Sequence, residues 1–239
     1  MVNWQFWKRR TPARILRLRP RGELSDAVRV EFPELAPDVR TYLGQAAYLQ
    51  LGYFETLTRL IRATPDLAEK EALSLAAGAA LRKHLALLAE IREEDADPAE
   101  LMEPFREPLD AFRRATVGAR PRETMLTVHI TAGLLDDFYL ALASGYGERG
   151  RRVARILRAD NDRRQLAELL TETIRGDEEW RALLSLWARR LVGDTLLVAR
   201  GALLLDGDGR GEAARAVEPV FTALMAAHAR RMDALGLAS

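Results

Sequence analysis

Histidines with an acidic residue one helical turn away are a first sign of metal chemistry in a helical protein, because residues three positions apart share one helix face. The chain has three histidines, His84, His129 and His228. No aspartate or glutamate lies three or four positions before or after any of them. The Glu-x-x-His ligand pair is therefore absent. We interpret His84 and His129, which lie on apolar stripes, as hydrogen-bonded core residues, and His228 as a surface or boundary residue.

Two isolated acids, Glu55 and Asp137, lie in otherwise apolar helical stretches. A carboxylate that faces a protein core is costly unless it is ion-paired or bound to a metal, so both are candidates for a functional site. The alternative is that both are boundary residues. Glu55 would then pair with Arg59 one turn later, and Asp137 would lie at the rim of a helix bundle.

Other chemical signatures are missing from the sequence. Because the chain has no cysteine, it has no disulfide, no zinc-thiolate site and no thiol nucleophile. It also lacks the glycine-rich phosphate-binding loop and the Gly-x-Ser-x-Gly turn of serine hydrolases. The isolated acids and the histidines therefore remain the candidates for a functional site.

The elements that position these side chains are long amphipathic helices. From Asp38 onward, apolar residues recur every three or four positions, with 48% hydrophobic residues in the whole chain. Pro104 and Pro108 interrupt the segment 97–114, which we predict to be an irregular crossover of short turns. The predicted helices span about 38–63, 67–94, 121–145, 151–174, 178–205 and 212–235.

Long helices with one long crossover are typical of a four-helix bundle of the ferritin-like type, here with additional helices. We therefore predict an all-α fold for residues 38–239. Residues 1–37 differ, because residues 27–32 alternate like a strand that has no partner. We predict that this segment is a basic, partly extended N-terminal arm.

The basic arm carries a charge opposite to that of the rest of the chain. The formal net charge is +1 and residues 1–22 hold +7, so the remaining residues carry −6. The aromatic residues beside these lysine and arginine side chains could stack on the nucleobases of RNA, or they could lie on an anionic membrane surface. The alternative is that the arm packs on the bundle or on a second subunit. The residues of this candidate interface are Trp4, Trp7, Lys8, Arg9, Arg10, Arg14 and Arg17.

The sequence predicts a cytoplasmic protein without a transmembrane segment. No apolar run follows the basic start, as it would in a signal peptide. The longest apolar stretch, residues 196–205, is broken by Arg200 and is shorter than the roughly 20 residues of a membrane span. The absence of cysteine fits a reducing compartment.

Several segments resemble a known family. They include Tyr53-Phe54-Glu55-Thr56-Leu57 and residues 102–112, 137–139, 186–194 and 228–237. In these segments the chain resembles ferritin-like proteins of GC-rich bacteria and is similar to the di-iron hydroxylase of the tRNA base 2-methylthio-isopentenyl-adenosine. The resemblance covers about residue 38 to the end.

This resemblance implies positions for the metal ligands. Glu55 and Asp137 match the carboxylates of the first and third helices, whereas neither residue at the second-helix Glu-x-x-His position is a ligand. The ammonium group of Lys83, at this position, could take the place of a metal cation by pairing with Glu55 or Asp137. The implied site, which is vestigial or non-standard, consists of Glu55, Ala80, Lys83, Asp137, Ala159 and Asp162.

Two functions follow as alternatives. The favoured one is a ferritin-like protein that has lost its di-iron site, holds no cofactor, and acts as a non-catalytic binding or assembly protein. Its partner would be a second copy or another protein, and RNA could bind through the arm. The other is a metal-dependent oxidoreductase similar to the tRNA-modifying di-iron hydroxylases, with di-iron held by the non-standard ligands Glu55, His84, Asp137 and Asp162.

Overall fold

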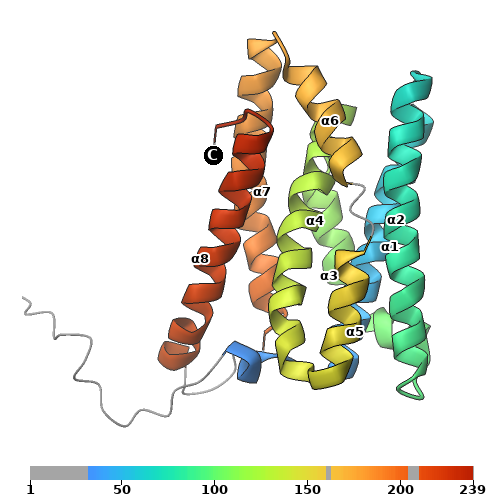
Figure 1. The fold of residues 1–239 in the computed structure, drawn as a ribbon, viewed down its shortest axis with the longest axis vertical. Coiled ribbons are helices and arrows are strands. Elements are labelled where there is room, and N and C mark those ends of the chain that lie inside the picture. The colour runs from blue at the N-terminus through green and yellow to red at the C-terminus, as the bar shows by residue number, and fades with distance from the viewer. Residues whose placement is uncertain (1–31, 160–162, 204–209, 239) are drawn as a thin grey trace, which may run out of the picture.

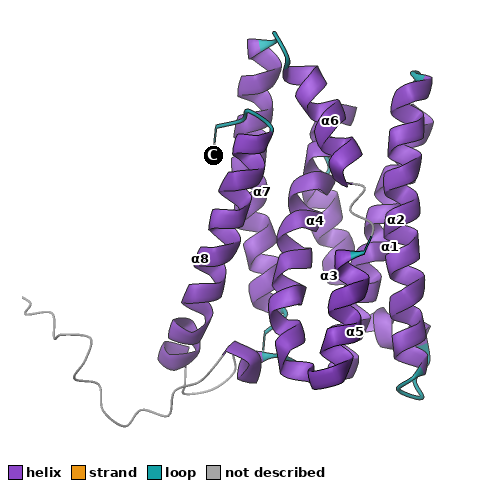
Figure 2. Ribbon diagram, in the orientation of Figure 1, coloured by secondary structure: helices purple, strands orange, loops and turns teal. Residues whose placement is uncertain are grey.

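Helices are the only regular secondary structure among the described residues. The computed structural model describes residues 32–159, 163–203 and 210–238, which form eight α-helices and two short 3-10 helices. Over these ranges there is no strand, and Figure 2 shows only helices and loops. The predicted all-α fold is confirmed. The residues of the candidate RNA-binding arm, from Trp4 to Arg17, lie outside the described ranges.

Two long helices form a hairpin near one edge of the molecule (Figure 1). They are α1 (Val39–Ala63) and α2 (Leu67–Arg92). Asp38 starts α1, because its side chain accepts hydrogen bonds from the backbone N–H groups at positions 40 and 41. Asp66 starts α2 by accepting from the N–H group of Glu69. These boundaries lie within two residues of the predicted ones.

The centre of the core is α4 (Pro121–Ala143). It packs against α1, α5, α6, α7 and α8. Its apolar residues are almost inaccessible to solvent, and they include Leu126, Ile130, Leu134 and Phe138. This distribution fits a helix that is apolar on nearly all sides. Residues of α4 are therefore the best placed to meet side chains from several other helices.

The predicted irregular crossover is wrong, because residues Pro98–Thr116 form one continuous helix, α3. Pro104 and Pro108 lie inside it and both are exposed. A proline inside a helix removes one N–H group and leaves the carbonyl four residues earlier without its helical donor. On the solvent side that carbonyl can bind water instead, so the helix tolerates both prolines.

The predicted helix over residues 151–174 is also wrong, because the structure has two shorter helices there. They are α5 (Gly147–Arg158) and α6 (Arg163–Ile174), joined through residues 159–162. The sequence between them, Asp160-Asn161-Asp162, consists of residues that favour caps and turns over helix interiors. The short 3-10 helix η2 (Ser144–Tyr146) leads from α4 into α5.

The last two helices are α7 (Glu178–Gly201) and α8 (Arg210–Ala234). Asp177 starts α7 by accepting from the N–H group of Trp180, as predicted. Before the bundle, η1 (Phe32–Leu35) contacts α8 and α4, and Leu35 is buried. The described end of the expected arm, residues 32–37, thus joins the bundle instead of extending away from it.

Two helical stretches are long and apolar enough to cross a membrane by length and composition alone, Leu67–Arg92 and Pro121–Arg158. In the second, 83% of the apolar window is buried inside the molecule, as in the core helix of a soluble protein. In α2 the buried share is 44%. The absence of a transmembrane segment stays a prediction.

Candidate functional site

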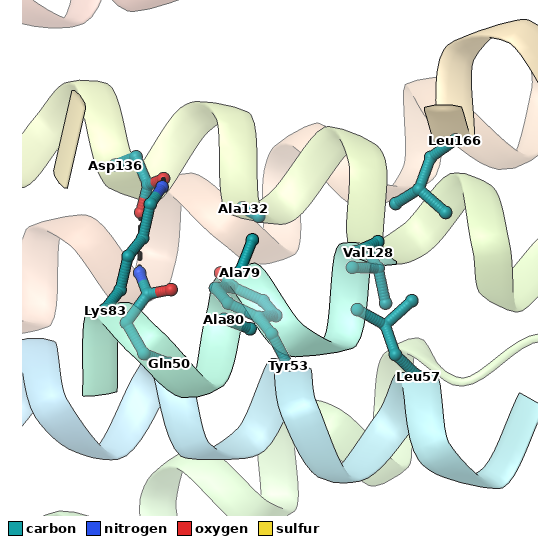
Figure 3. Close-up of a pocket in the computed structure, with 11 residues that line it drawn as sticks. Gln50, Tyr53, Leu57, Ala79, Ala80, Lys83, Val128, Ala132, Asp136 and Leu166 are labelled. Atoms are coloured by element: carbon teal, nitrogen blue, oxygen red, sulfur yellow. Dashed lines mark hydrogen bonds and ion pairs between the residues drawn. The ribbon is translucent and has the colours of Figure 1, made fainter. Parts of the chain in front are cut away.

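Three helices bring polar side chains together inside the bundle. Gln50 comes from α1, Lys83 from α2 and Asp136 from α4 (Figure 3). The Lys83 Nζ lies 3.0 Å from the Asp136 Oδ2, and the Gln50 Nε2 donates a hydrogen bond of 2.8 Å to the Asp136 Oδ1. Only 7% of Lys83 and 3% of Asp136 are exposed to solvent. We call these three residues the interior triad.

The interior triad is a matched set of donors and acceptors. Removing two charges from water costs several kcal/mol per ion, which close pairing and further hydrogen bonds must offset. Gln50 supplies such a bond to the carboxylate oxygen that Lys83 does not use. The ammonium group has three N–H donors, and Asp136 takes one of them. The ammonium group of Lys83 is thus stabilised inside the bundle by one close carboxylate, that of Asp136.

A cavity of about 40 Å³ adjoins the triad. This is room for a few water molecules or one small molecule, and far less than a drug-sized ligand needs. The triad closes one end, and the rest of the wall is mostly apolar (Figure 3). The wall residues come from α1, α2, α4 and α6, and include Tyr53, Leu57, Ala76, Ala79, Ala80, Val128, Ala132 and Leu166.

Buried tyrosines lie near the triad and stay uncharged. The Tyr42 hydroxyl donates to the backbone oxygen of Tyr139 at 2.9 Å, and the Tyr139 hydroxyl donates to Gln45 at 3.2 Å. Burial raises the pKa of Tyr42 far above its ordinary value, and the nearby groups Tyr146, Tyr139 and Asp136 raise it further. Burial likewise raises the pKa of Tyr139. These phenols therefore add no negative charge to the interior at neutral pH.

Glu55, the expected first-helix ligand, faces α3 instead of the cavity. Its Oε2 accepts a hydrogen bond of 2.5 Å from Arg113, while Arg59 lies at 3.9 Å. Arg113 also binds Asp110 on its own helix, and Tyr48 donates to Asp110 at 2.9 Å. Burial and this bond raise the pKa of Tyr48 to about 12. Glu55 thus belongs to a polar cluster that joins α1 to α3.

Asp137, the expected third-helix ligand, binds α8. Its carboxylate accepts from Arg231, whose Nη2 also donates to the backbone oxygen of Gly133 at 3.1 Å. Helix α8 approaches closely here, since a Cβ atom at position 133 would lie 2.6 Å from the Arg231 Nε. The residue that meets Lys83 is Asp136, one position earlier. The expectation that Lys83 pairs with Glu55 or Asp137 is therefore wrong, because the partner of Lys83 is the neighbouring acid Asp136.

The remaining candidates do not converge on one point either. The His84 Nδ1 lies 2.9 Å from the backbone oxygen of Ala47, which is the bond of a core histidine. Ala80 lines the cavity, but Ala159 is exposed at the end of α5. Asp162 lies outside the described residues. His228, expected at the surface or boundary, is only 3% exposed, because α8 packs it against the bundle.

A model of a protein family, described as a ferritin-like domain of actinomycetes, matches residues 35–204. This chain belongs to that ferritin-like family. No curated protein matches the chain. The family match extends from the end of η1 to just beyond α7, so α8 lies outside it.

A di-iron centre of the ferritin-like kind needs a glutamate from each of two helices and a Glu-x-x-His pair from each of the other two. The wall of this cavity offers one carboxylate, Asp136, and no imidazole. A protonated lysine has no lone pair for a metal. In the part of the chain that the structure describes, no three histidine, aspartate or glutamate residues come together to hold a metal ion. The described residues do not fit a di-iron centre.

Neither Gln50 nor Asp136 is predicted from the sequence. A signal for Asp136 was present, because it lies four residues after Ala132 and three before Tyr139, both on the buried stripe of α4. Asp137 is predicted instead, both as an isolated acid in an apolar stretch and from the resemblance, and the two adjacent acids differ only by a rotation of about 100° around the helix. Gln50, in the middle of α1, gave no comparable signal, because most glutamines lie on protein surfaces.

Proposed function

We propose that this ferritin-like protein has an internal salt bridge in place of a di-iron centre and acts as a non-catalytic binding or assembly protein. The observation that carries the proposal is the ion pair between Lys83 and Asp136. Lys83 and Ala80 stand where the family resemblance puts the Glu-x-x-His pair of the second helix, and both line the interior cavity. A protein cation thus lies where a metal cation is expected.

The surrounding contacts support this proposal. The carboxylates of Glu55 and Asp137 are ion-paired to Arg113 and Arg231 on two different faces of the bundle. The alternative is an oxidoreductase similar to the tRNA-modifying di-iron hydroxylases. It would require both acids to leave their arginines and His84 to leave the backbone of Ala47. The geometry favours the non-catalytic function.

Metal analysis of the purified full-length chain tests the proposal. We expect no stoichiometric iron or manganese after anaerobic incubation with Fe(II) or Mn(II) followed by desalting. A stoichiometric amount of iron in the wild-type chain, with loss of that iron in Glu55→Gln or Asp137→Asn, would overturn it and favour the oxidoreductase.

A pair of variants sharpens this experiment. The double variant Ala80→Glu/Lys83→His restores the Glu-x-x-His spacing on α2 and should increase metal retention over the wild type. The control is Lys83→Met, which removes the charge but adds no ligand. If Lys83→Met alone retained metal as well as the double variant, the increase could not be assigned to restored ligands.

We also propose a cytoplasmic location, supported by the absence of cysteine. The partner is proposed to be a protein, either a second copy or another chain. RNA is the proposed partner of the basic arm. The seven lysine and arginine residues of the arm and the aromatic residues beside them support this proposal.

A further inference from the structure

The outward face of α2 carries large apolar side chains. Leu75 is 48% exposed, Leu85 is 54% exposed, and Leu67 near the start of the helix is 79% exposed. Helix α2 lies at the outer edge of the molecule, on the side away from α8 (Figure 1). Its opposite face packs mainly against α1. A helix at the edge of a monomer would normally present polar residues to water, so this face is typical of an interaction surface.

The spacing along this face is symmetrical. Leu75, Gly78, Arg82 and Leu85 follow one another at intervals of three, four and three residues. These intervals are the same in both directions along the helix, and the midpoint of the four positions is residue 80. An antiparallel second α2 would therefore place each Leu75 opposite a Leu85 and each Arg82 opposite a Gly78. A two-fold symmetric interface requires this kind of self-complementarity.

Gly78 provides the space that such a contact needs. A Cβ atom added there would meet only the Arg82 Nη1, at 3.2 Å, so no element of the bundle packs over it. Glycine lowers the stability of an exposed helix interior relative to alanine, and one reason to find it there is close approach by another backbone. In the antiparallel pair, the backbone at Gly78 of one copy would face position 82 of the other.

The charges of α2 agree with the same arrangement. Glu71 and Arg92 are both exposed and lie at opposite ends of the helix. With the midpoint at position 80, Glu71 lies opposite position 89 of the second copy, one helical turn from its Arg92. The symmetry produces this pair twice. A parallel arrangement would instead place like charges beside each other.

We propose that the outer face of α2, defined here as Glu71, Leu75, Gly78, Arg82, Leu85 and Arg92, binds the same face of a second copy in antiparallel orientation. This inference specifies the partner of the assembly role proposed above and rests on that role. It uses none of the residues of the interior triad. Oligomeric state therefore tests the α2 interface, and metal content tests the loss of the di-iron centre.

Charge substitution at the two leucines tests the surface. The wild-type chain should be a dimer by sedimentation velocity, and Leu75→Glu/Leu85→Glu should be a monomer with unchanged helical circular dichroism. The matched control is Leu186→Glu/Leu197→Glu, since these leucines of α7 are even more exposed than Leu75 and Leu85 and should leave the dimer intact. A wild-type chain that stays monomeric at high concentration overturns the proposal, as does a dimer that survives the α2 substitutions.

Cysteine cross-linking tests the orientation, because the natural chain has no cysteine that could interfere. Mixing Leu75→Cys protein with Leu85→Cys protein should give a disulfide between the two variants under mild oxidation. Each variant alone should link poorly, because its two cysteines would be about 15 Å apart along the helices and a disulfide spans less than about 7 Å. Efficient linking of Leu75→Cys to itself would overturn the antiparallel arrangement.

The outcomes separate this inference from the proposed function. A monomer without bound metal overturns the α2 interface alone, whereas a dimer with stoichiometric iron overturns the non-catalytic role alone. A monomer that binds phosphatidylglycerol vesicles through Leu75 and Leu85 would assign the face to a membrane and also overturn the interface.

Discussion

Lys83 carries its charge into the interior of a ferritin-like bundle, where a single carboxylate and a glutamine amide compensate for the lost water. The cavity beside it is small, and its wall includes four alanines. The sequence identified Lys83 as the unusual residue but not its partner. The reason is physical: residues 136 and 137 point about 100° apart on α4, and only packing decides which one faces inward.

Removing Lys83 should cost much of the stability of the fold. Lys83→Met leaves Asp136 buried without its cation, so we expect a loss of about 3 to 5 kcal/mol in the free energy of unfolding. The double variant Lys83→Met/Asp136→Leu should recover most of this loss, because an apolar pair can replace a buried ion pair. Denaturant unfolding followed by circular dichroism measures both values.

Lys70→Met on the same helix is the control for this experiment. Lys70 is only half-buried and belongs to no ion pair among the described residues, so we expect a change within about 0.5 kcal/mol. Equal losses in the single and double Lys83 variants would show that the charge of Asp136 is not the cause.

His228 should make stability depend on pH. Burial, and then the charge of Arg231, lower its pKa in the folded chain, whereas in the unfolded chain it titrates near about 6.5. The unfolded chain therefore binds more protons as the pH falls through this value, and the folded state loses stability. His228→Gln should flatten the stability profile between about pH 5 and pH 7. An unchanged slope in thermal or denaturant unfolding would contradict this.

At the scale of single elements, the sequence predicts helices well where capping and apolar spacing agree. The starts of α1, α2 and α7 follow from Asp38, Asp66 and Asp177, whose side chains bind the first free N–H groups. The prediction was wrong for α3, since the sequence does not reveal that its prolines face water. It was also wrong at the end of α5, where the backbone leaves the helix at Ala159.

The continuity of α3 leads to a prediction about Pro104. Pro104→Ala restores the hydrogen bond to the carbonyl of Glu100, and we expect a gain of about 1 to 2 kcal/mol after the greater freedom of the unfolded chain is allowed for. The control is Pro121→Ala, since Pro121 occupies the first turn of α4, where no helical bond is lost. Thermal unfolding compares the two. A gain in the control, or none in Pro104→Ala, would contradict the explanation.

At the scale of the whole molecule, the chain combines a helical body of net charge −6 with a basic N-terminal segment of +7. The family match covers the body from the end of η1 to just beyond α7. It includes neither the basic segment nor α8.

A docking role for the arm predicts RNA binding that depends on it. The full chain should bind single-stranded RNA more tightly than a variant lacking residues 1–22. Its affinity should also fall steeply with salt, because each phosphate contact on a single strand adds about −0.7 to the slope. Fluorescence anisotropy at two salt concentrations measures both effects, with anionic vesicles as the parallel test of membrane binding. Equal binding by the two proteins would favour an arm that packs on protein.

The contact between α4 and α8 joins Gly133 and Arg231, residues 98 positions apart in the chain. Phe138 on α4 also packs edge-on against Phe221 of α8. During translation at about 5 to 20 residues per second, α8 leaves the ribosome roughly 5 to 20 s after this part of α4. For that interval the nascent chain holds its core helix with one apolar side uncovered. Chaperone binding and premature aggregation should therefore concentrate on this stage of synthesis.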